Sequence, residues 1–313
     1  MPTTRQLPAF AAIGGAVAIG AMTAVQARIN GVLGVRLEDG VVAGLVSFGS
    51  GLLLLVVLVG VVPSGRAGMV RLWRGVRSGG IPPWMLLGGA CGALTVTTQG
   101  LTAAVLGVSL FTVGVVAGQT LHSLILDRIG FGPAGVVAVT MGRVAGGALA
   151  LVAVGISLGG DVLASAPLWM LILPFAAGIG IAWQQAANGR LAQRVGSPVI
   201  ATTMSFIAGT VVLALAAGIS VIVNGPPASL PTEPWVYLGG LLGVVYIFLG
   251  ARLVAQTGVL LLGLGSVLGQ LITAVIIDAV WPAEAGPSLW QTVAMVAVAV
   301  ASVLVAVIRP RRR

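Results

Sequence analysis

Amide side chains recur at helical spacing within apolar stretches of this 313-residue chain. Gln26 and Asn30 are four residues apart, as are Gln184 and Asn188, so each pair shares one face of a helix. An amide in an apolar interior must be hydrogen-bonded, because leaving it unpaired costs roughly 2–7 kcal/mol. Each pair therefore predicts contact with a polar substrate or, since the pairs approach the ends of predicted helices, a capping or gating role. The glycine after each asparagine would suit a helix C-cap.

Two further glutamines, Gln119 and Gln270, lie near the middle of apolar stretches, each directly after a glycine. Glycine lets another helix or a ligand approach the backbone closely. These glutamines are predicted either to line a cavity or to form an interhelical hydrogen bond, and both interpretations stay open. Trp183, beside Gln184, could shape a substrate pocket, although an aromatic residue at the membrane interface is the favoured interpretation.

Three titratable residues are candidates for proton coupling. His122 titrates near neutrality and lies one helical turn from Gln119, with a hydrogen-bonded packing histidine as the alternative. Asp127 and Asp278 occur at predicted helix ends, where a carboxylate could bind a proton or a cation. The favoured interpretation for them is a solvated end residue, paired for instance with Arg128.

The sequence has no phosphate-binding Walker loop, no His-Glu-x-x-His motif and no carboxylates paired at catalytic spacing. We therefore expect no enzymatic activity, no catalytic residue, no cofactor and no metal site.

Composition excludes a water-soluble protein. Hydrophobic residues make up 58% of the chain and charged residues 7%, whereas a soluble domain carries about 25% charge. Mean hydropathy is +1.11. The 16 basic residues are all arginines and give a net charge of +9, but they follow the ends of apolar stretches, which indicates membrane topology rather than a nucleic-acid partner.

Crossing roughly 30 Å of hydrocarbon takes about 20 apolar residues, and on that basis the chain is predicted to be an all-α membrane protein with ten transmembrane helices. With both termini on one side, that side holds 13 of the 16 arginines, so both termini are expected in the cytoplasm. The Arg-rich segment 63–83 is predicted to be a cytoplasmic loop. The predicted helices are 8–27, 41–62, 84–105, 108–127, 137–158, 168–187, 198–222, 235–256, 258–279 and 288–308.

An internal repeat is the most informative pattern. Gln26-x-x-x-Asn30-Gly31 and Ser47-Phe48-x-x-Gly51 recur 158 residues later, and later motifs recur at an offset of 151 residues. Each copy holds five predicted helices, an odd number, so the second copy must enter the membrane from the opposite side. Residues 1–158 and 159–313 are therefore predicted to be two inverted five-helix repeats, as in alternating-access transporters. The motifs at the second offset are Trp84-x-x-Leu87-Gly88-Gly89-x-x-Gly92, Gly118-Gln119 and Asp127, which recur as Trp235-x-x-Leu238-Gly239-Gly240-x-x-Gly243, Gly269-Gln270 and Asp278.

These motifs resemble the YdcZ-type family of small bacterial inner-membrane proteins, within the drug/metabolite transporter superfamily. The chain is similar to the fused ten-helix form of the family over nearly all of residues 8–308. The resemblance implies two inverted repeats around a central cavity, lined by the first four helices of each repeat. It implies a transporter without implying a substrate. One departure is that the small multidrug branch uses a glutamate in its first helix, whereas segment 8–27 has no acidic residue.

The sequence therefore predicts a secondary transporter of the bacterial inner membrane that moves a small polar metabolite or drug-like molecule by alternating access. Its expected partners are the lipid bilayer and a small-molecule substrate, and a monomer or a homodimer would suffice. Two alternatives are a flippase for lipids or lipid-linked sugars and a non-transporting accessory subunit. An integral membrane enzyme is less compatible, because the polar residues are repeated on both sides instead of forming one catalytic cluster.

Overall fold

The computed structural model describes residues 8–157, 168–227 and 229–281, with isolated residues between 290 and 305. In these ranges the chain forms nine α-helices and no strand. Short 3-10 turns precede α4 and α10, and a π-helical turn at Gln99–Ala103 joins α4 to α5. The helices are α1 (Ala9–Arg36), α2 (Gly40–Val61), α3 (Pro63–Arg77), α4 (Gly88–Thr98), α5 (Ala104–Arg128), α6 (Met141–Ser157), α8 (Leu168–Val195), α9 (Pro198–Asn224) and α10 (Gly239–Val280).

Many large apolar side chains lie on the outer faces of the helices, and several small and polar ones are buried. In α2 the buried face carries Gly44, Ser47 and Gly51, whereas Leu53 and Val57 point outward. Large apolar residues on an outer face fit a lipid environment and not water. Four segments of the described chain are long and apolar enough to cross a membrane. The protein is therefore membrane-embedded, and these segments are Phe10–Arg36, Gly40–Val61, Pro198–Asn224 and Pro234–Ile277.

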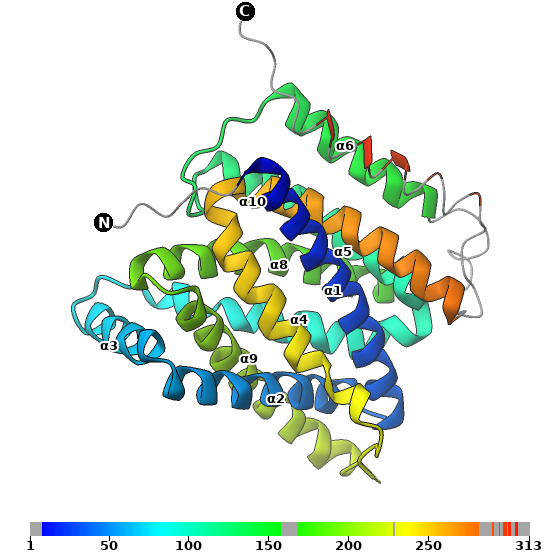
Figure 1. The fold of residues 1–313 in the computed structure, drawn as a ribbon. Coiled ribbons are helices and arrows are strands. Elements are labelled where there is room, and N and C mark those ends of the chain that lie inside the picture. The colour runs from blue at the N-terminus through cyan, green and yellow to red at the C-terminus, as the bar shows by residue number, and fades with distance from the viewer. Residues whose placement is uncertain are drawn as a thin grey trace, which may run out of the picture.

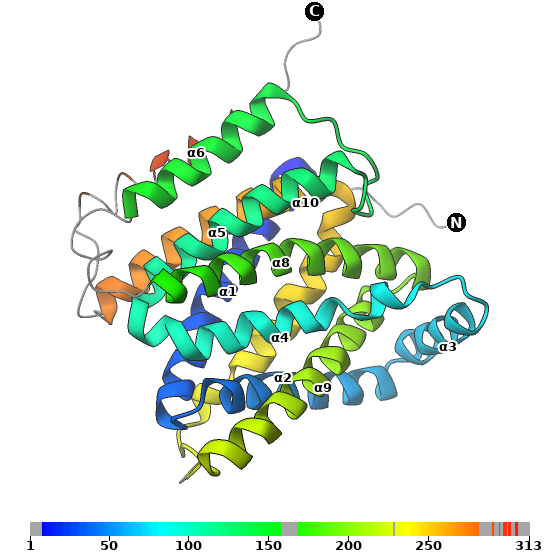
Figure 2. The same cartoon turned by 180° about the vertical axis from the view of Figure 1, so that it is seen from behind.

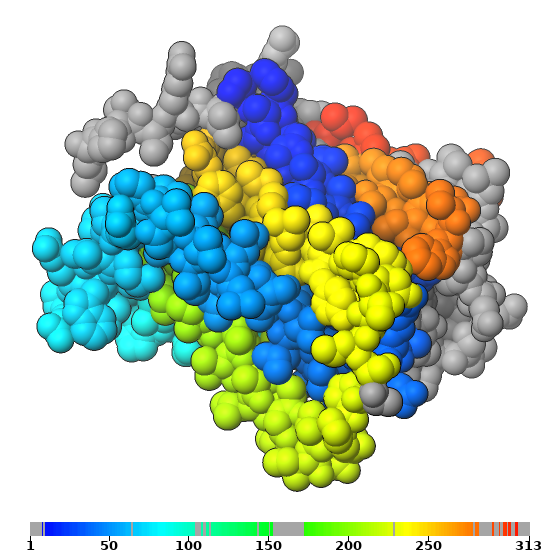
Figure 3. All heavy atoms as spheres, turned by 60° about the horizontal axis from the view of Figure 1, so that its bottom comes forward, coloured from blue at the N-terminus to red at the C-terminus, as the bar shows by residue number. Residues whose placement is uncertain are grey.

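Two long helix pairs form the centre of the fold. α1 lies along α10 and α5 lies along α8, and α6 covers the outer side of α5 (Figures 1 and 2). The space-filling view shows α2, α9 and the first half of α10 side by side on one face (Figure 3). α3 and the end of α8 lie at one end of the molecule, and the end of α1 and the start of α10 lie at the other (Figure 1).

Glycines allow the closest helix crossings. A Cβ atom on Gly118 of α5 would collide with the Phe175 carbonyl of α8, and one on Gly269 of α10 would collide with the Val17 carbonyl of α1. The sequence prediction that the glycine before each glutamine allows a close approach is confirmed at both sites. Gly20 and Gly178 make the reciprocal approaches from the other helix of each pair, to the carbonyls of Ser266 and Val115.

Several predicted boundaries were wrong. Segments 8–27 and 168–187 continue as helix to Arg36 and Val195, because only isolated glycines follow them and no proline interrupts. Segment 63–83, predicted to be a loop, begins with the helix α3, since Pro63 is favourable at the first helical position.

The predicted helices 235–256 and 258–279 form one element, α10, whose direction changes at Gly258. There the backbone adopts φ 73° and ψ 169°, a conformation that only glycine reaches readily. The break lies one residue after the gap predicted between the two segments, which was residue 257. Most residues of the tenth predicted helix, 288–308, lie outside the described part of the chain.

Candidate functional site

Gln26 and Asn30 of α1 belong to a buried amide cluster. Gln26 donates from Nε2 to the Gly239 carbonyl at the start of α10, over 2.6 Å. Asn30 donates from Nδ2 to Oε1 of Gln99, over 2.7 Å. Both α1 side chains are no more than 1% exposed. The cluster thus joins α1 to the π-helical turn and to the first turn of α10.

Gln184 and Asn188 of α8 form a second cluster of the same kind. Gln184 Nε2 donates to Ser205 Oγ of α9 over 2.9 Å, and Asn188 Nδ2 donates to the same oxygen over 3.3 Å. Gly88, at the start of α4, lies against Asn188, as Gly239 lies against Asn30. The two residues of each predicted pair therefore lie on one helix face, as expected. That face contacts the first residue of a helix from the other half of the chain.

The C-cap interpretation of the two Asn-Gly pairs was wrong. α1 continues six residues beyond Asn30 and α8 seven residues beyond Asn188. Gly189 is instead a close-contact residue, because a Cβ atom there would lie 2.7 Å from Pro133 Cγ and closer still to Val254. Both asparagines are interior residues.

Gln119 and Gln270 are buried at two different helix crossings. Gln119 is fully buried on α5 beside Ser123, facing Gly263 of α10, and both of its amide atoms lack a partner among the described residues. Gln270 donates to Ser266 Oγ of its own helix over 3.2 Å. The two glutamines thus lie apart, and the choice between cavity lining and interhelical bonding stays a prediction.

Asp127 is not the solvated end residue that the sequence favoured. Its carboxylate is 2% exposed and accepts the backbone N–H groups of Val259 and Leu260, at 2.9 and 3.1 Å. The break at Gly258 frees these N–H groups from the helix ladder, and a group freed inside a membrane needs a new acceptor. Asp127 at the end of α5 therefore acts as the N-cap of the second half of α10.

The other singled-out residues take separate places. His122 is half-buried on α5. Asp278 lies near the end of α10, and its side chain lies outside what the structure describes. Trp183 joins an aromatic cluster with Trp84 and Phe131, at centroid distances of 6.4 Å to each. An equivalent cluster at the opposite end pairs Trp235 with Trp281, 5.7 Å apart.

Arginines accompany both aromatic clusters. Arg190 lies 5.5 Å from the Phe131 ring and 6.0 Å from Trp84, while Arg28 lies 4.7 Å over Trp281. Aromatic rings with arginines at both ends of the helices are typical of membrane interfaces. This arrangement supports the interfacial interpretation of Trp183.

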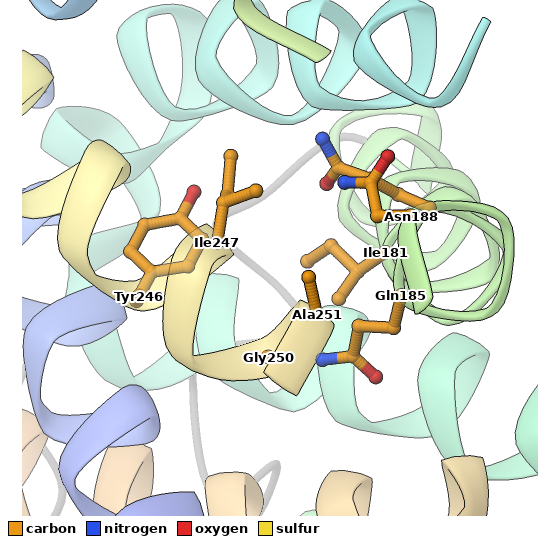
Figure 4. Close-up of a pocket in the computed structure, with 8 residues that line it drawn as sticks. Ile181, Gln185, Asn188, Tyr246, Ile247, Gly250 and Ala251 are labelled. Carbon is orange, nitrogen blue, oxygen red and sulfur yellow. The ribbon is translucent and has the colours of Figure 1, made fainter. Parts of the chain in front are cut away.

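A small pocket lies between α8 and α10, next to the second amide cluster. Figure 4 shows Ile181, Gln185 and Asn188 on α8 facing Tyr246 and Ile247 on α10. Its volume is about 20 Å³, which is room for about one water molecule. The remaining lining residues are Gln184, Gly250 and Ala251.

Polar contacts tie the two halves of the chain together at the end that carries α3. Arg71 Nε donates to the Val195 carbonyl over 2.6 Å, and Arg194 donates to the Gly80 carbonyl. Arg190 donates to the Gly130 carbonyl in the segment after α5. These bonds close the arginine end, by which we mean Arg71, Arg190, Arg194 and their partners.

Among the described residues, fewer polar contacts close the opposite end. Arg36 pairs with Glu233, and Ser220 Oγ donates to Asp39 over 2.6 Å. The hydrogen bond from the Arg36 guanidinium lowers the pKa of the Glu233 carboxyl below its ordinary value. Contacts therefore join the two halves of the chain at both ends of the described structure.

Sequence reasoning missed Gln99, Ser205 as a shared acceptor, Tyr246 and the arginine contacts. Gln99 gave one available signal, since it is an amide within an apolar stretch whose repeat partner, Gly250, is not polar. The arginine contacts gave none, because their acceptors are backbone carbonyls, which every residue carries.

The chain matches a family model described as "Putative inner membrane exporter, YdcZ" over residues 11–157 and 169–305. The chain belongs to this YdcZ family. The two matched segments are consistent with a fused two-repeat member of the YdcZ family, and membership makes a membrane transporter the expected class of protein.

Eleven solved chains are similar to this YdcZ-family protein. One, described only as "Crystal structure of protein", is 17% identical, with a TM-score of 0.59 and 95% of each chain covered. At that identity the likeness concerns the fold alone. No curated protein matches the chain.

Proposed function

We propose that this YdcZ-family protein is a secondary transporter that carries a small polar molecule across the bacterial inner membrane by alternating access. The moving units would be two inverted five-helix repeats, residues 1–158 and 159–313. The family description as an exporter favours outward transport. Both termini and the arginine end would then face the cytoplasm, as the positive-inside rule requires.

The exchanged contacts carry this proposal. Gly20 of α1 approaches Ser266 of α10, and its repeat equivalent Gly178 approaches Val115, the equivalent of Ser266. The same relation holds for a second set of contacts. Gly118 approaches Phe175, and its equivalent Gly269 approaches Val17, the equivalent of Phe175. Equivalent residues that exchange partners in this way support a two-fold relation between the proposed repeats. Such a relation allows the contacts closing one end to be exchanged for those closing the other.

The polar groups fit a substrate route between the repeats. Two buried amide clusters lie beside α10 and α8, toward opposite ends of the molecule, and each is followed toward its end by arginine and aromatic residues. Contacts at both ends of the described structure are the kind that an alternating-access cycle would have to break one end at a time. The bilayer and a small solute are the partners that this mechanism needs, and a monomer contains both repeats.

The test is a thermal-stability screen of the detergent-purified protein, followed by flux measurements in proteoliposomes. Metabolites, amphiphilic cations and lipid precursors are added in turn, because a ligand of the folded state raises Tm with its concentration. A solute that raises Tm and crosses protein-containing vesicles faster than empty ones supports the proposal. Movement of lipid precursors alone would indicate a flippase instead, and solutes that bind without any flux would contradict transport.

A further inference from the structure

One residue distinguishes the two amide clusters. Around Asn30, the fully buried Gln99 supplies the hydrogen-bond acceptor, with Oε1 at 2.7 Å. At the repeat offset of 151 residues Gln99 corresponds to Gly250. A Cβ atom built on Gly250 would meet no atom within 4 Å. The half of the molecule around Asn188 therefore has space where the other half has an amide.

That space belongs to the pocket between α8 and α10, which Gln184, Asn188 and Gly250 help to line (Figure 4). One wall comes from α8 and the other from α10. The present volume of about 20 Å³ holds about one water molecule. Because the walls are separate helices, a small movement of α8 away from α10 would enlarge the pocket without unfolding either.

The hydrogen bonds of the two amide clusters also differ, and the asparagine of the second cluster is the less well paired. Asn188 Nδ2 reaches Ser205 Oγ only over 3.3 Å, and that oxygen already accepts from Gln184 at 2.9 Å. A long bond to a shared acceptor is weak. In the other half, the Ser47 hydroxyl lacks a partner among the described residues, while Asn30 donates to Gln99. A ligand oxygen in the pocket could therefore take the N–H of Asn188 as Gln99 takes that of Asn30.

We propose that this pocket binds an uncharged carbonyl or carboxamide group of the substrate, in the position that the Gln99 amide occupies in the other half. The inference rests on the proposed transport function and specifies its substrate class. Gln185 Oε1, a lining group without a partner in the described part of the chain, is available to accept an amide N–H. None of the eight lining residues is charged, and an unpaired charge within a membrane is costly. The site therefore selects neutral amides over carboxylates and ammonium ions.

The test uses the full-length protein in detergent and propionamide as the probe, with propionate and propylamine as charged probes of similar size. Propionamide at millimolar concentration is expected to raise Tm, and the charged probes are not. Gly250→Gln places the side chain of Gln99 in the second half, so it should remove the propionamide response and raise Tm by itself. Gly250→Leu fills a similar volume and removes the same helix-interior glycine but has no amide, so it should remove the response with a smaller gain in Tm than Gly250→Gln.

A second variant tests the inference independently of Gly250. Gln99→Gly should lower Tm, because Asn30 loses its acceptor, and should create a second propionamide site. Its Tm should therefore rise more with propionamide than that of the unmodified protein.

A propionamide response that survives Gly250→Gln, or no added response in Gln99→Gly, would overturn the inference. Transport is judged separately. If a solute from the stability screen crosses vesicles equally fast with the unmodified protein and with Gly250→Gln, transport stands and this site assignment fails. If no bound solute crosses at all, it is the transport function that fails.

Discussion

Replacing Asp127 with alanine should destabilise the protein strongly, because this buried carboxylate holds the break in α10 together. The carboxylate is 2% exposed and caps two N–H groups where α10 breaks at Gly258. A hydrogen bond to a charged group contributes about 1.5–3 kcal/mol. Two such bonds, with no water to replace them, give an expected loss of about 3–6 kcal/mol. Asp127→Asn keeps one acceptor oxygen and should lose about half as much.

Asp39 provides a matched control. It is also an aspartate that caps a helix by accepting two backbone N–H groups, from Val41 and Val42, at 2.8 and 3.0 Å. It is only partly buried at the end of the molecule, where water can replace the carboxylate. Asp39 also accepts from Ser220 Oγ, so this control is measured in a Ser220→Ala background. There, Asp39→Ala should cost about 1 kcal/mol, the usual value for an exposed N-cap.

Unfolding of both variants is measured by titrating a denaturing detergent into protein-containing micelles and following helix content or tryptophan fluorescence. The expected difference of about 2 kcal/mol or more corresponds to roughly a thirtyfold difference in the unfolding equilibrium constant. If Asp127→Ala costs no more than Asp39→Ala, burial does not strengthen the cap, and the role assigned to Asp127 is wrong.

Three further predictions concern packing, topology and pH. Gly118→Ala should reduce the monodisperse fraction in size-exclusion chromatography, because its Cβ atom would meet the Phe175 backbone. Gly218→Ala is the control, since a Cβ atom there has no atom within 4 Å. Equal monodisperse fractions for the two variants would contradict this prediction. In a Cys91→Ala background, an impermeant maleimide should label Ser78→Cys from the cytoplasmic side and Asn224→Cys from the outer side, and labelling of both from one side would refute the topology. Because Arg36 lowers the pKa of Glu233 below its ordinary value of 4.5, this ion pair should stabilise the protein above that pH and lose its contribution as the pH falls through the lowered value. Tm measured against pH should then fall more steeply below pH 4.5 in the unmodified protein than in Glu233→Gln, by a small amount since both side chains are exposed.

Much of the architecture follows from local sequence features. Apolar length and arginine placement indicate membrane helices, and the glycine before each of Gln119 and Gln270 correctly predicts a close helix approach. The amide pairs at four-residue spacing share a helix face wherever the helix lies in the fold. The gap between segments 235–256 and 258–279 lies one residue before the break at Gly258. These inferences hold because each depends on residues close together in the chain.

Tertiary structure decided where those features meet. The partner of Asp127 is a pair of N–H groups more than 130 residues away, and no spacing rule connects a carboxylate to backbone that a distant glycine has freed. Asn-Gly pairs resemble helix ends locally, but close contacts across α8 and α10 make Gly189 an interior residue. The repeated residues can be read directly from the chain. That Gln99 fills one half and Gly250 leaves the other open became visible only in the fold, because a side chain's effect on a cavity depends on the helices that surround it.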